Sequence, residues 1–416
     1  MRALIVGGGI GGLTAALSLH AAGLDGQIVE AASSLRPLGV GINLQPHAVR
    51  ELTELGLGDE LAATGIPTSF MTFTDRFGGV IIALPRGRSA GYLWPQYSIH
   101  RGELQALLLE AVLDRMGAPS VRTGVTFQGF IQDAEGVTVE LCSGGEMTHE
   151  RFDVLIGADG IHSAVRARLH PARNDLQGCG IHMWRGAVEG EPFMDDGTVL
   201  VAGSNATAKF VAYPISARAR ARGKALINWV AEVKVGEPGP VRDADWDRQG
   251  RLGDVIGHFA GWKHALLDIP AVIEGTERIL SYPMVDKDPL DSWGEGRVTL
   301  LGDAAHPVYP IGSNGGSQAV LDARVLARCL ATADTPSDGL ARYEAERREV
   351  TNALVLGHRT LPMEATIRLV TERAPGGFDD IARVLTPQEL ADMAEAQRRI
   401  TDIDVDELNH RASWSV

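Results

Sequence analysis

Apolar runs, glycine-rich turns and amphipathic stretches alternate along the first part of the chain. Residues 3–6 (ALIV) form a continuous apolar run, typical of a strand that is buried on both faces of a parallel sheet. Apolar residues then recur at helical spacing from Leu13 to Leu17, and a second apolar run covers residues 27–31 (QIVEA). This order of strand, helix and strand favours an α/β fold.

Two later apolar runs have the same form. Residues 154–157 (VLIG) lead into a turn at Asp159 and Gly160, and residues 298–302 (VTLLG) lead into Asp303. A long apolar helix is predicted from about Ser317. Both runs are predicted to be buried strands whose carboxyl ends lie where ligands bind in open α/β sheets.

The middle of the chain and its end follow other patterns. Strands of an antiparallel sheet are predicted for residues 69–85, 180–190, 198–203, 209–216, 225–233 and 278–285. The basic run at residues 217–224 (ARARARGK) lies between two of these strands and is interpreted as a solvated hairpin tip. Helices are predicted over 349–370, with Pro362 interrupting them, and over 387–400, and we expect them to pack across the α/β part.

The composition limits the possible function classes. With 416 residues, 44% of them hydrophobic, the chain can bury a large core, and its length suggests two or three domains. The formal charge of −14 argues against a nucleic-acid partner. No apolar segment reaches the roughly 18 residues of a membrane span, and glycines interrupt the apolar start without a cleavage site after it. We therefore expect neither a membrane anchor nor a signal peptide.

The spacing of the cysteines and histidines limits the redox compartment and the kinds of site that the chain can form. Cys142, Cys179 and Cys329 form no C-x-x-C pair, which argues against a disulfide framework and against a zinc site. The 12 histidines show no metal-binding spacing. We expect a reducing, cytoplasmic compartment and no metal ion.

Three glycines, Gly7, Gly9 and Gly12, stand at G-x-G-x-x-G spacing between the first strand and the first helix. In such a unit the first permits a tight turn, the second lets the backbone approach a pyrophosphate, and the third lets helix and strand pack closely. Glu30 ends the second strand, where a carboxylate accepts the hydroxyls of an adenosine ribose and disfavours a 2′-phosphate. The unit predicts binding of the ADP half of FAD or NAD, with a plain glycine-rich turn as the alternative.

The turn at Asp159 and Gly160 leads into a helix that carries Ser163 and Arg166. Asp159 and the turn backbone can meet a ribose or pyrophosphate, with Arg166 available for phosphate charge. The alternative is a strand-to-helix turn in which Asp159 and Ser163 cap the helix.

The third motif favours a flavin. Asp303 can accept hydroxyls of a ribityl chain, Pro307 and Pro310 stiffen the loop that follows, and glycines then let the backbone approach a flat ligand. The free N–H groups and the positive dipole end near Ser317 favour an anion, and reduced flavin carries its negative charge at the pyrimidine edge. An ordinary capped helix after a loop is the alternative.

In this order the three motifs resemble those of the class A flavoprotein monooxygenases, single-component aromatic hydroxylases with the para-hydroxybenzoate hydroxylase fold. The resemblance covers residues 1 to about 350. It implies an enzyme that binds FAD, consumes NAD(P)H and dioxygen, and hydroxylates an aromatic ring through a flavin C4a-hydroperoxide. Because the chain has no second fingerprint for a nicotinamide domain, we expect NAD(P)H to bind transiently to the FAD domain, with the basic run 217–224 as an alternative phosphate contact.

The resemblance also implies site residues. The expected FAD contacts are Gly7, Gly9, Ile10, Gly11, Gly12, Glu30, Ala31, Arg36, Gly41, Ile42, Arg101, Asp159, Gly160, Arg166, Gly302, Asp303, Pro310, Gly315, Gly316 and Ser317. Pro310, Gly312 and Ser313 are expected nearest the reactive edge of the flavin. The chain departs from the family's G-Q-G-x-N pattern, because Ser317 stands at the usual asparagine position.

Several segments look like the 5-methylphenazine-1-carboxylate 1-monooxygenase subgroup, among them residues 35–43 (LRPLGVGIN) and 309–323 (YPIGSNGGSQAVLDA). The subgroup implies an aromatic or N-heteroaromatic substrate, with a phenazine-like carboxylate as the leading guess, hydroxylated at the carboxyl-bearing carbon with loss of carbon dioxide. The expected substrate contacts are Trp184, Arg185, Tyr213 and Tyr282, with Arg185 pairing a substrate carboxylate. Filling of the core is the alternative for the aromatic residues.

The expected fold is therefore α/β, with a Rossmann-like FAD-binding domain, an inserted antiparallel-sheet substrate domain and C-terminal helices. The FAD-binding domain is predicted over residues 1–68, 98–178 and 279–350, the substrate domain over 69–97 and 179–278, and the helical segment over 351–416. A monomer or a homodimer fits this organisation. Two other functions stay open: an FAD-dependent dehydrogenase or reductase without oxygen transfer, and a non-catalytic FAD-fold binding protein.

Overall fold

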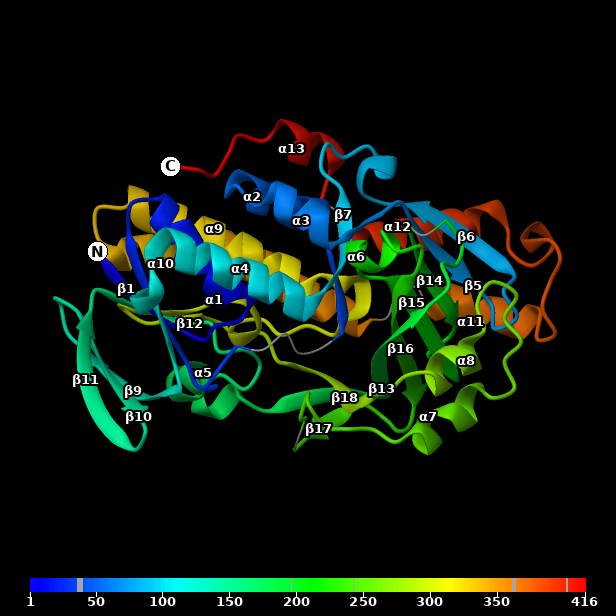
Figure 1. Ribbon diagram of the computed structural model, residues 1–416, viewed down its shortest axis with the longest axis horizontal. Helices are drawn as coiled ribbons and strands as arrows, with labels where there is room; N and C mark the ends of the chain where they lie inside the picture. Colours follow the sequence, from blue (N-terminus) through cyan, green and yellow to red (C-terminus); the bar gives the residue numbers. More distant parts are fainter. Residues whose placement is uncertain (36–39, 196, 243, 361–363, 402) are drawn as a thin grey trace.

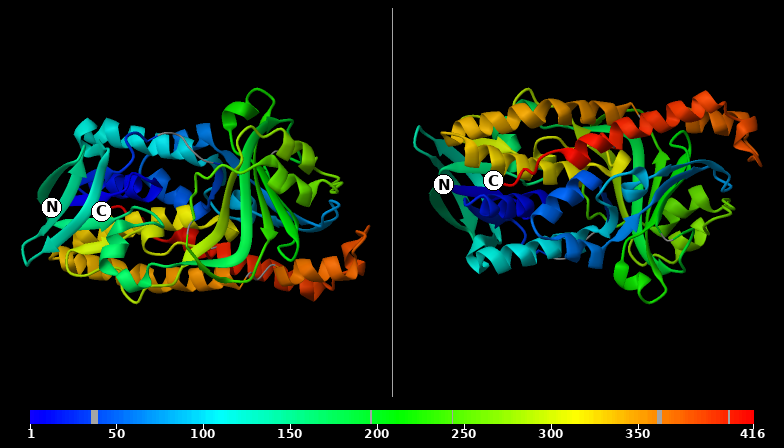
Figure 2. Two further views of the ribbon diagram at one scale, coloured as in Figure 1. Left: turned by 90° about the horizontal axis from the view of Figure 1, so that it is seen from below. Right: turned by 90° about the horizontal axis from the view of Figure 1, so that it is seen from above.

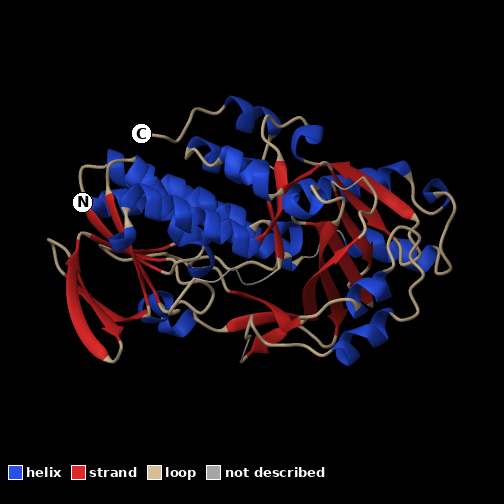
Figure 3. Ribbon diagram, viewed as in Figure 1, coloured by secondary structure: helices blue, strands red, loops and turns tan. Residues whose placement is uncertain are grey.

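The computed structural model of the chain describes residues 1–35, 40–195, 197–242, 244–360, 364–401 and 403–416. The described part is elongated, with strands concentrated at its two ends (Figures 1 and 3). An α/β unit that contains the N-terminus occupies one end, and a large sheet occupies the other.

A parallel sheet forms the centre of the α/β unit, with the strand order β19-β12-β1-β2-β8. All neighbouring pairs in this order are parallel. The strands are β1 (Arg2–Val6), β2 (Asp25–Glu30), β8 (Val121–Thr123), β12 (Val154–Gly157) and β19 (Val298–Leu300). The predicted Rossmann-like α/β architecture is confirmed, and the four apolar runs that predicted it lie side by side.

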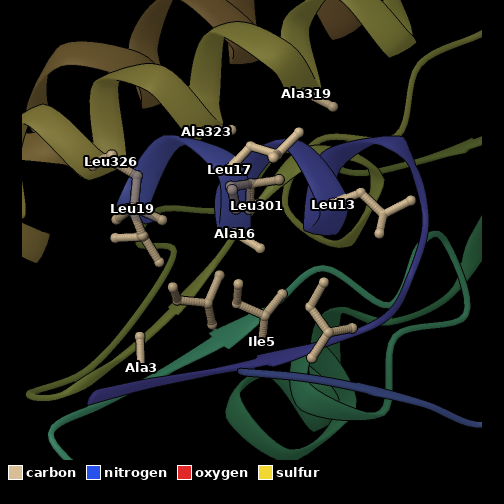
Figure 4. Packing of buried hydrophobic residues seen from close by; sticks show 14 of the residues in the cluster. Ala3, Ile5, Leu13, Ala16, Leu17, Leu19, Leu301, Ala319, Ala323 and Leu326 are labelled. Atoms are coloured by element: carbon tan, nitrogen blue, oxygen red, sulfur yellow. The ribbon is translucent and has the colours of Figure 1, made fainter. Parts of the chain in front are cut away.

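Long helices lie in layers over this sheet. They are α1 (Ile10–Ala21), α4 (Arg101–Met116), α9 (Gly315–Thr332) and α10 (Pro336–Arg359). α1 packs on the strands, α4 and α9 pack on α1, and α10 packs on α9. Every residue of α1 from Gly12 to Leu19 is buried. The reason is its position: Figure 4 shows α1 between Ala3 and Ile5 of the sheet on one side and Ala319 and Ala323 of α9 on the other. Helical spacing alone predicts one buried face; the second comes from α9.

The large sheet has the strand order β17-β13-β16-β15-β14-β5-β6, and β18 also pairs with β13. Its strands are β5 (Phe70–Thr74), β6 (Val80–Pro85), β13 (Leu176–Gly190), β14 (Thr198–Gly203), β15 (Ala208–Pro214), β16 (Ala225–Lys234), β17 (Gly239–Val241) and β18 (Leu280–Lys287). The sheet is antiparallel as predicted, except that β14 and β5 pair in parallel. This pair brings a segment from the first hundred residues into a sheet formed mostly by residues 176–287.

One face of the large sheet is covered by α7 (Leu252–Phe259) and α8 (Ile269–Glu274). A cluster of large side chains fills this layer, including the stacked rings of Phe210 and Trp229, whose centroids lie 5.7 Å apart.

The other face is covered in part by α11 (Glu364–Arg373) and α12 (Pro387–Thr401). Ile367, Val370 and Met393 from this segment pack on Met71 and Phe73 of β5. Residues 349–359 of the first predicted helix belong to α10, which packs on α9 of the α/β unit as expected. For α11 and α12 the expectation is wrong: Figure 2 shows them following α10 along one side of the molecule to the large sheet. The reason is that α10 already covers the α/β unit on this side, whereas the large sheet still offers an apolar face to α11 and α12.

Shorter elements join these layers. A small sheet has the order β3-β7-β4 and another the order β11-β10-β9. The remaining strands and helices are β3 (Gly41–Leu44), β4 (Ile66–Thr68), β7 (Gln96–His100), β9 (Val125–Gln132), β10 (Val137–Ser143), β11 (Glu146–Phe152), α2 (Pro46–Glu54), α3 (Gly58–Thr64), α5 (Ala164–Leu169), α6 (Ala217–Arg220) and α13 (Val405–His410).

The end of the chain is held on α2 by a buried ionic network. Glu51 accepts from Arg324 at 3.1 Å and from Arg411 at 2.5 Å, while Arg50 donates to the carbonyl oxygens of Leu408 and Arg411. The basic run at 217–224 forms the short helix α6 and an exposed turn, where Lys224 pairs with Glu191. Of the helices that the structure describes, none has the length and apolarity needed to cross a membrane.

Candidate functional site

The three glycine-containing motifs meet at the carboxyl edge of the parallel sheet. A Cβ built on Gly7 would lie 2.4 Å from the carbonyl oxygen of Ala158, next to Asp159. A Cβ on Gly11 would lie 2.7 Å from Leu301 and 3.3 Å from Ala319. Because β1 lies beside β12, and β12 beside β19, the ends of the strands bring segments 150 residues apart into contact.

In the first turn, Gly9 has free space beside its backbone, whereas Gly7 and Gly12 have none. Gly7 has φ = +111°, which disfavours a side chain. A Cβ on Gly12 would lie 2.0 Å from the carbonyl oxygen of Gly7, so the helix packs directly on the turn. Apart from its neighbours in the chain, no described residue has an atom within 4 Å of a Cβ on Gly9. The backbone is therefore free to meet a ligand at Gly9, at the start of α1.

Glu30 stabilises the glycine cradle, which is the glycine turn at Gly7–Gly12. Its carboxylate accepts hydrogen bonds from the backbone N–H groups of Gly8 at 2.7 Å and of Ala32 at 2.8 Å. Gln105 of α4 donates to the carbonyl oxygen of Gly8 at 2.8 Å. Ala31 is exposed beside Glu30, and Ile10 and Gly11 begin α1. Sequence reasoning missed Gln105, although its place four residues after Arg101 on a predicted helix pointed to the same face.

The Asp159 turn is built differently from the expectation. One carboxylate oxygen of Asp159 accepts from Ser163 at 2.5 Å, and the other accepts from the backbone N–H of Ala164 at 2.7 Å. Burial raises the pKa of Asp159, although these hydrogen bonds oppose the rise. The carboxylate thus caps α5, the alternative that the sequence left open. Gly160 has φ = +75°, and apart from its chain neighbours no described atom lies within 4 Å of a Cβ position there.

Arg166 does not offer its charge to a phosphate. Its side chain is fully buried, and its guanidinium donates to the carbonyl oxygens of Ala304, Ala305, Arg173 and Asp288. Burial lowers the pKa of Arg166 to about 10. The expected phosphate contact is corrected here: Arg166 ties α5 to the turn after Gly302 from behind the cradle.

A second buried network holds the Gly302 turn. Asp322 accepts from the backbone N–H of Gly302 at 3.0 Å, contacts His306 at 2.6 Å and accepts from Arg347 at 2.7 Å. Burial alone would raise the pKa of Asp322, but the charges of His306 and Arg347 lower it to about 2. The position of Gly302, with φ = +61°, therefore depends on a carboxylate from α9.

Asp303 projects from this turn into open space. Its side chain is exposed, although the surrounding concave protein surface displaces water and raises the pKa of the carboxyl group; the charges of His306 and Arg101 oppose this rise. A Cβ on Gly315 would lie 3.7 Å from its Oδ1 atom. Asp303, Arg101 and the start of α9 thus border the same concavity.

The N-terminus of α9 has no side-chain cap. Ser317 is buried, and its hydroxyl accepts from the backbone N–H of Gln45 at 3.0 Å instead of facing the concavity. A Cβ on Gly316 would lie 3.7 Å from the side chain of Ile42. The first N–H groups of α9 are therefore available to an anionic ligand edge, with Ile42 beside them.

The loop before α9 is held from β3. Gly312 and Ser313 both have positive φ, +74° and +53°. Gln45 donates to the carbonyl oxygen of Gly312 at 3.2 Å, and Asn43 donates to the hydroxyl of Ser313 at 3.3 Å. These contacts stabilise a backbone conformation that is unfavourable for Ser313. Asn43 and Gln45 were not predicted.

Gly41 joins β3 to the large sheet. Its carbonyl oxygen accepts from Arg185 at 2.7 Å and from Tyr213 at 3.0 Å, and its N–H donates to Asn228 at 2.7 Å. Arg185 also donates to the hydroxyl of Tyr282 at 3.3 Å. The structure thus brings three predicted substrate contacts together at the boundary between the two parts of the molecule.

Trp184 lies elsewhere. It belongs to the hydrophobic cluster under α7 and α8, on the opposite face of the sheet from Arg185. Neighbouring residues of a strand point to opposite faces, so Trp184 and Arg185 cannot both line one site. The expected substrate contact at Trp184 is therefore wrong, and the core-filling alternative is correct.

A pocket opens between the large sheet, the loop before α9 and the C-terminal helices. Its loop wall is Pro310–Ser313, which contains the three residues expected nearest the reactive flavin edge. Its apolar wall comes from Met71, Phe73, Val199, Val201, Val211, Ile311 and Ile367. Its polar lining comes from Lys209, Glu232, Glu364 and Gln397, none of which sequence reasoning identified.

Lys209 is the centre of that polar lining. Its ammonium lies 2.9 Å from Glu232 and 3.2 Å from Glu364, and all three side chains are largely buried. Burial alone would lower the pKa of Lys209, but the two carboxylates raise it. The alternation of Lys209 with Val211 and Tyr213 on β15 could have revealed that Lys209 faces the site.

Arg36, an expected FAD contact, lies outside the described residues.

Comparisons with known proteins agree with this geometry. A family profile described as an FAD binding domain matches residues 1–243 and 271–357. The phenazine 1,6-dicarboxylic acid hydroxylase PhzS of Lysobacter antibioticus is 49% identical over 360 residues, which cover 86% of this chain and 88% of that protein. The aurachin C monooxygenase/isomerase of Stigmatella aurantiaca is 35% identical over 361 residues, covering 86% and 88%.

Solved structures give the same result. The crystal structure of Klebsiella pneumoniae HpxO complexed with FAD and uric acid matches with a TM-score of 0.74 and 25% identity, covering 96% of this chain and 97% of that one. A further relative by sequence is the 3-hydroxybenzoate 6-hydroxylase of Klebsiella oxytoca, which is 31% identical over 373 residues that cover 87% of this chain and 88% of that protein.

Proposed function

Because this chain belongs to the family of proteins with an FAD binding domain, we propose that the concavity at the carboxyl edge of the parallel sheet holds FAD and that the adjoining pocket receives an aromatic ring. The chain is an FAD-dependent hydroxylase of aromatic substrates, a monooxygenase whose relatives carry out this chemistry on small aromatic molecules. FAD is its cofactor, and NAD(P)H is the transient reductant that is typical of the family.

The residues present fit FAD. The backbone at Gly9 is open, so a pyrophosphate can approach the N-terminus of α1. Glu30 stands at the end of β2 with a carboxylate for the adenosine ribose, and Asp303 projects an exposed carboxylate for the ribityl chain. The uncapped start of α9, with Gly315 and Gly316, supplies N–H groups for the pyrimidine edge.

The chain's own residues have defined tasks in the reaction. When bound, FAD supplies the redox chemistry: it takes a hydride from NAD(P)H and activates dioxygen. The N–H groups at the start of α9 would hold the pyrimidine edge of the cofactor and favour negative charge there. Pro310, Gly312 and Ser313 line the pocket on the side of α9, and its apolar lining would exclude water from a bound substrate. The overall reaction consumes one dioxygen, one NAD(P)H and one proton, and it yields one ring hydroxyl, one water and one NAD(P)+. Where the hydroxyl replaces a carboxylate, a second proton is consumed and one carbon dioxide leaves.

The proposed substrate is an N-heteroaromatic carboxylate of the phenazine type. The 49% identity to a phenazine 1,6-dicarboxylic acid hydroxylase supports this class. Arg185 carries the positive charge nearest to Gly41, and its Nε atom is buried without a hydrogen bond, so it is the proposed partner of the substrate carboxylate. Tyr213 and Tyr282 orient Arg185. Hydroxylation at the carboxyl-bearing carbon with loss of carbon dioxide completes the proposal.

The observation that carries the proposal is the pocket itself, because its wall is the same loop, Pro310–Ser313, that leads into the start of α9. The test uses the purified FAD-loaded protein, NADH or NADPH, and phenazine-1-carboxylate under ¹⁸O₂. We expect accelerated NAD(P)H oxidation and a product that contains one ¹⁸O atom, with loss of the carboxyl group. NAD(P)H oxidation without labelled product would instead contradict oxygen transfer to this substrate.

A further inference from the structure

The face of the large sheet toward Gly41 carries three rows of side chains in register. Tyr213 pairs with Asn228, Val211 with Val230, and Lys209 with Glu232. Successive rows are two residues apart, so the first and third lie about 14 Å from each other along the strands. The first row contacts Gly41, the second is apolar, and the third lines the pocket. A ring over the second row therefore has a polar group at each end.

The two polar ends differ in charge. At the Gly41 end Arg185 is the charged side chain that contacts the strand. At the other end two carboxylates surround one ammonium, so the group formed by Lys209, Glu232 and Glu364 carries a formal net charge of −1. Their side chains are 8%, 7% and 15% exposed, which leaves little water to screen that charge.

The carboxylates of Glu232 and Glu364 differ in the number of hydrogen-bond donors around them. Glu364 accepts from the hydroxyl of Ser204 at 3.0 Å and from the backbone N–H of Asn205 at 2.7 Å, in addition to Lys209. Among the described residues Glu232 has only the Lys209 ammonium as a partner, 2.9 Å from its buried Oε2 atom. A carboxylate with a single donor keeps acceptor capacity for another.

One member of the group comes from outside the region that the family profile matches. The profile ends at residue 357, whereas Glu364, Ile367 and Gln397 belong to α11 and α12. These helices close the pocket over the third row. The family's common framework therefore does not by itself determine the charge at this end of the pocket.

We propose that Glu232 and Glu364, gathered around Lys209, determine substrate specificity by accepting a hydrogen-bond donor at the far end of the ring and excluding a second carboxylate there. This inference rests on the proposed function, because it requires a ring substrate in this pocket. A carboxylate at the Arg185 end is compatible with it. A second carboxylate at the opposite end meets a net negative charge in a poorly screened site and is rejected.

The test compares two ligands that differ by one charge. Phenazine-1-carboxylate has one carboxylate, and phenazine-1,6-dicarboxylate adds a second on the other outer ring. Binding to the FAD-loaded protein is titrated through the flavin absorbance change, without NAD(P)H, and kcat/KM is then measured for both. We expect the wild type to favour the monocarboxylate by roughly tenfold or more.

Two variants each remove one negative charge from the group. In E232Q and in E364Q the preference for the monocarboxylate should fall by roughly tenfold, mainly through tighter binding of the dicarboxylate. E191Q changes the net charge of the protein equally but lies on the exposed surface, in the pair with Lys224, and should keep the wild-type preference. The flavin spectrum of each variant reports whether it is folded and loaded, and either variant alone suffices for the test.

Failure of the specificity proposal and failure of the proposed function give different results. Wild-type protein that binds both ligands equally, or charge-removing variants that shift the preference no more than E191Q does, would overturn the specificity proposal while leaving hydroxylation intact. A wild type that binds and hydroxylates neither ligand would contradict the proposed function itself.

Discussion

The guanidinium of Arg185 donates a 2.7 Å hydrogen bond to the backbone oxygen of Gly41. This contact joins the large sheet to β3, the strand that also holds the loop before α9. A residue proposed to bind substrate is thereby fixed to the backbone beside the proposed FAD site, so the orientation of the two ligands is coupled through one strand.

Removing the charge of Arg185 should weaken binding of a carboxylate substrate. A hydrogen bond to a charged group is worth about 1.5–3 kcal/mol, so we expect the Kd of phenazine-1-carboxylate to rise roughly ten- to a hundredfold in R185M. R185K keeps the charge and should lose less. Unchanged affinity in R185M, with normal FAD content, would remove Arg185 from the substrate site.

A side chain at Gly41 should destabilise the junction. A Cβ there would lie 2.6 Å from Cγ2 of Ile215 and 2.8 Å from the side chain of Asn228, in a fully packed environment. We expect G41A to lower the free energy of unfolding by about 1–3 kcal/mol, measured by chemical denaturation. G236A, where no described atom lies within 4 Å of the new Cβ, serves as the control and should remain close to the wild type.

Gly9 should show the opposite behaviour. Its φ of −76° suits alanine, and its Cβ would enter open space, so the protein without FAD should be as stable as the wild type in G9A. Binding of FAD should weaken at least roughly tenfold, because the new methyl group occupies the approach to the backbone. Titration of the apoprotein with FAD measures this effect. G253A, in the distant helix α7, should bind FAD normally; an unaltered FAD affinity in G9A would contradict the placement of the pyrophosphate.

Asp322 should stabilise the fold in a pH-dependent way. Its pKa of about 2 lies below the usual 3.8, because the charges of His306 and Arg347 outweigh the effect of burial. The stabilisation is complete above the unfolded value and is lost as the pH falls toward 2; in total it amounts to about 2 kcal/mol, of which about 1 kcal/mol is lost between pH 5 and pH 3. The difference in unfolding free energy between the wild type and D322N should shrink by that amount over this interval. A constant difference would show that the carboxylate gains nothing from its charged partners.

His47 should make stability pH-dependent at a higher pH than Asp322 does, with the same sign. Burial, followed by the charges of Arg347 and Arg411, lowers its pKa from 6.5 to about 3. Below pH 6.5 the unfolded chain takes up a proton that folded His47 does not, so the folded state loses stability as the pH falls, by about 2 kcal/mol between pH 7 and pH 5. H47Q should lack this loss, and H20Q, at an exposed position on α1, should retain it. Parallel curves for H47Q and the wild type would exclude the effect.

The glycine motifs could be predicted from the sequence because each combines a specific backbone conformation with a nearby apolar strand. Gly7 needs a positive φ, Gly12 needs close packing, and the runs around Ile5, Ile156 and Leu300 need burial on both faces, so their order predicts a nucleotide-binding α/β unit. The same local reading is ambiguous for a charged side chain. Arg166 follows a glycine turn as a phosphate ligand would, yet its guanidinium donates to carbonyl groups, and three of them, those of Asp288, Ala304 and Ala305, come from segments more than a hundred residues away.

Substrate contacts were the least predictable part of the site. Trp184 and Arg185 were chosen by residue type, although the alternation of a strand allows only one of them to face Gly41. Lys209 and Glu232 are charged residues on strands, a position at which such residues usually face solvent. Their burial results from the cover of α11 and α12, whose own pattern shows an apolar face but not the surface that it packs against.

By itself the sequence determined the parallel sheet, the glycine cradle and the class of cofactor, because these depend on backbone conformation and on residues close together in the chain. Tertiary structure alone decided which face of the large sheet meets the pocket, that Glu364 reaches Lys209, and that Arg166 serves the fold instead of a ligand. These outcomes depend on long-range packing, in which several distant segments compete for the same apolar surface, and no local pattern records which of them is closest.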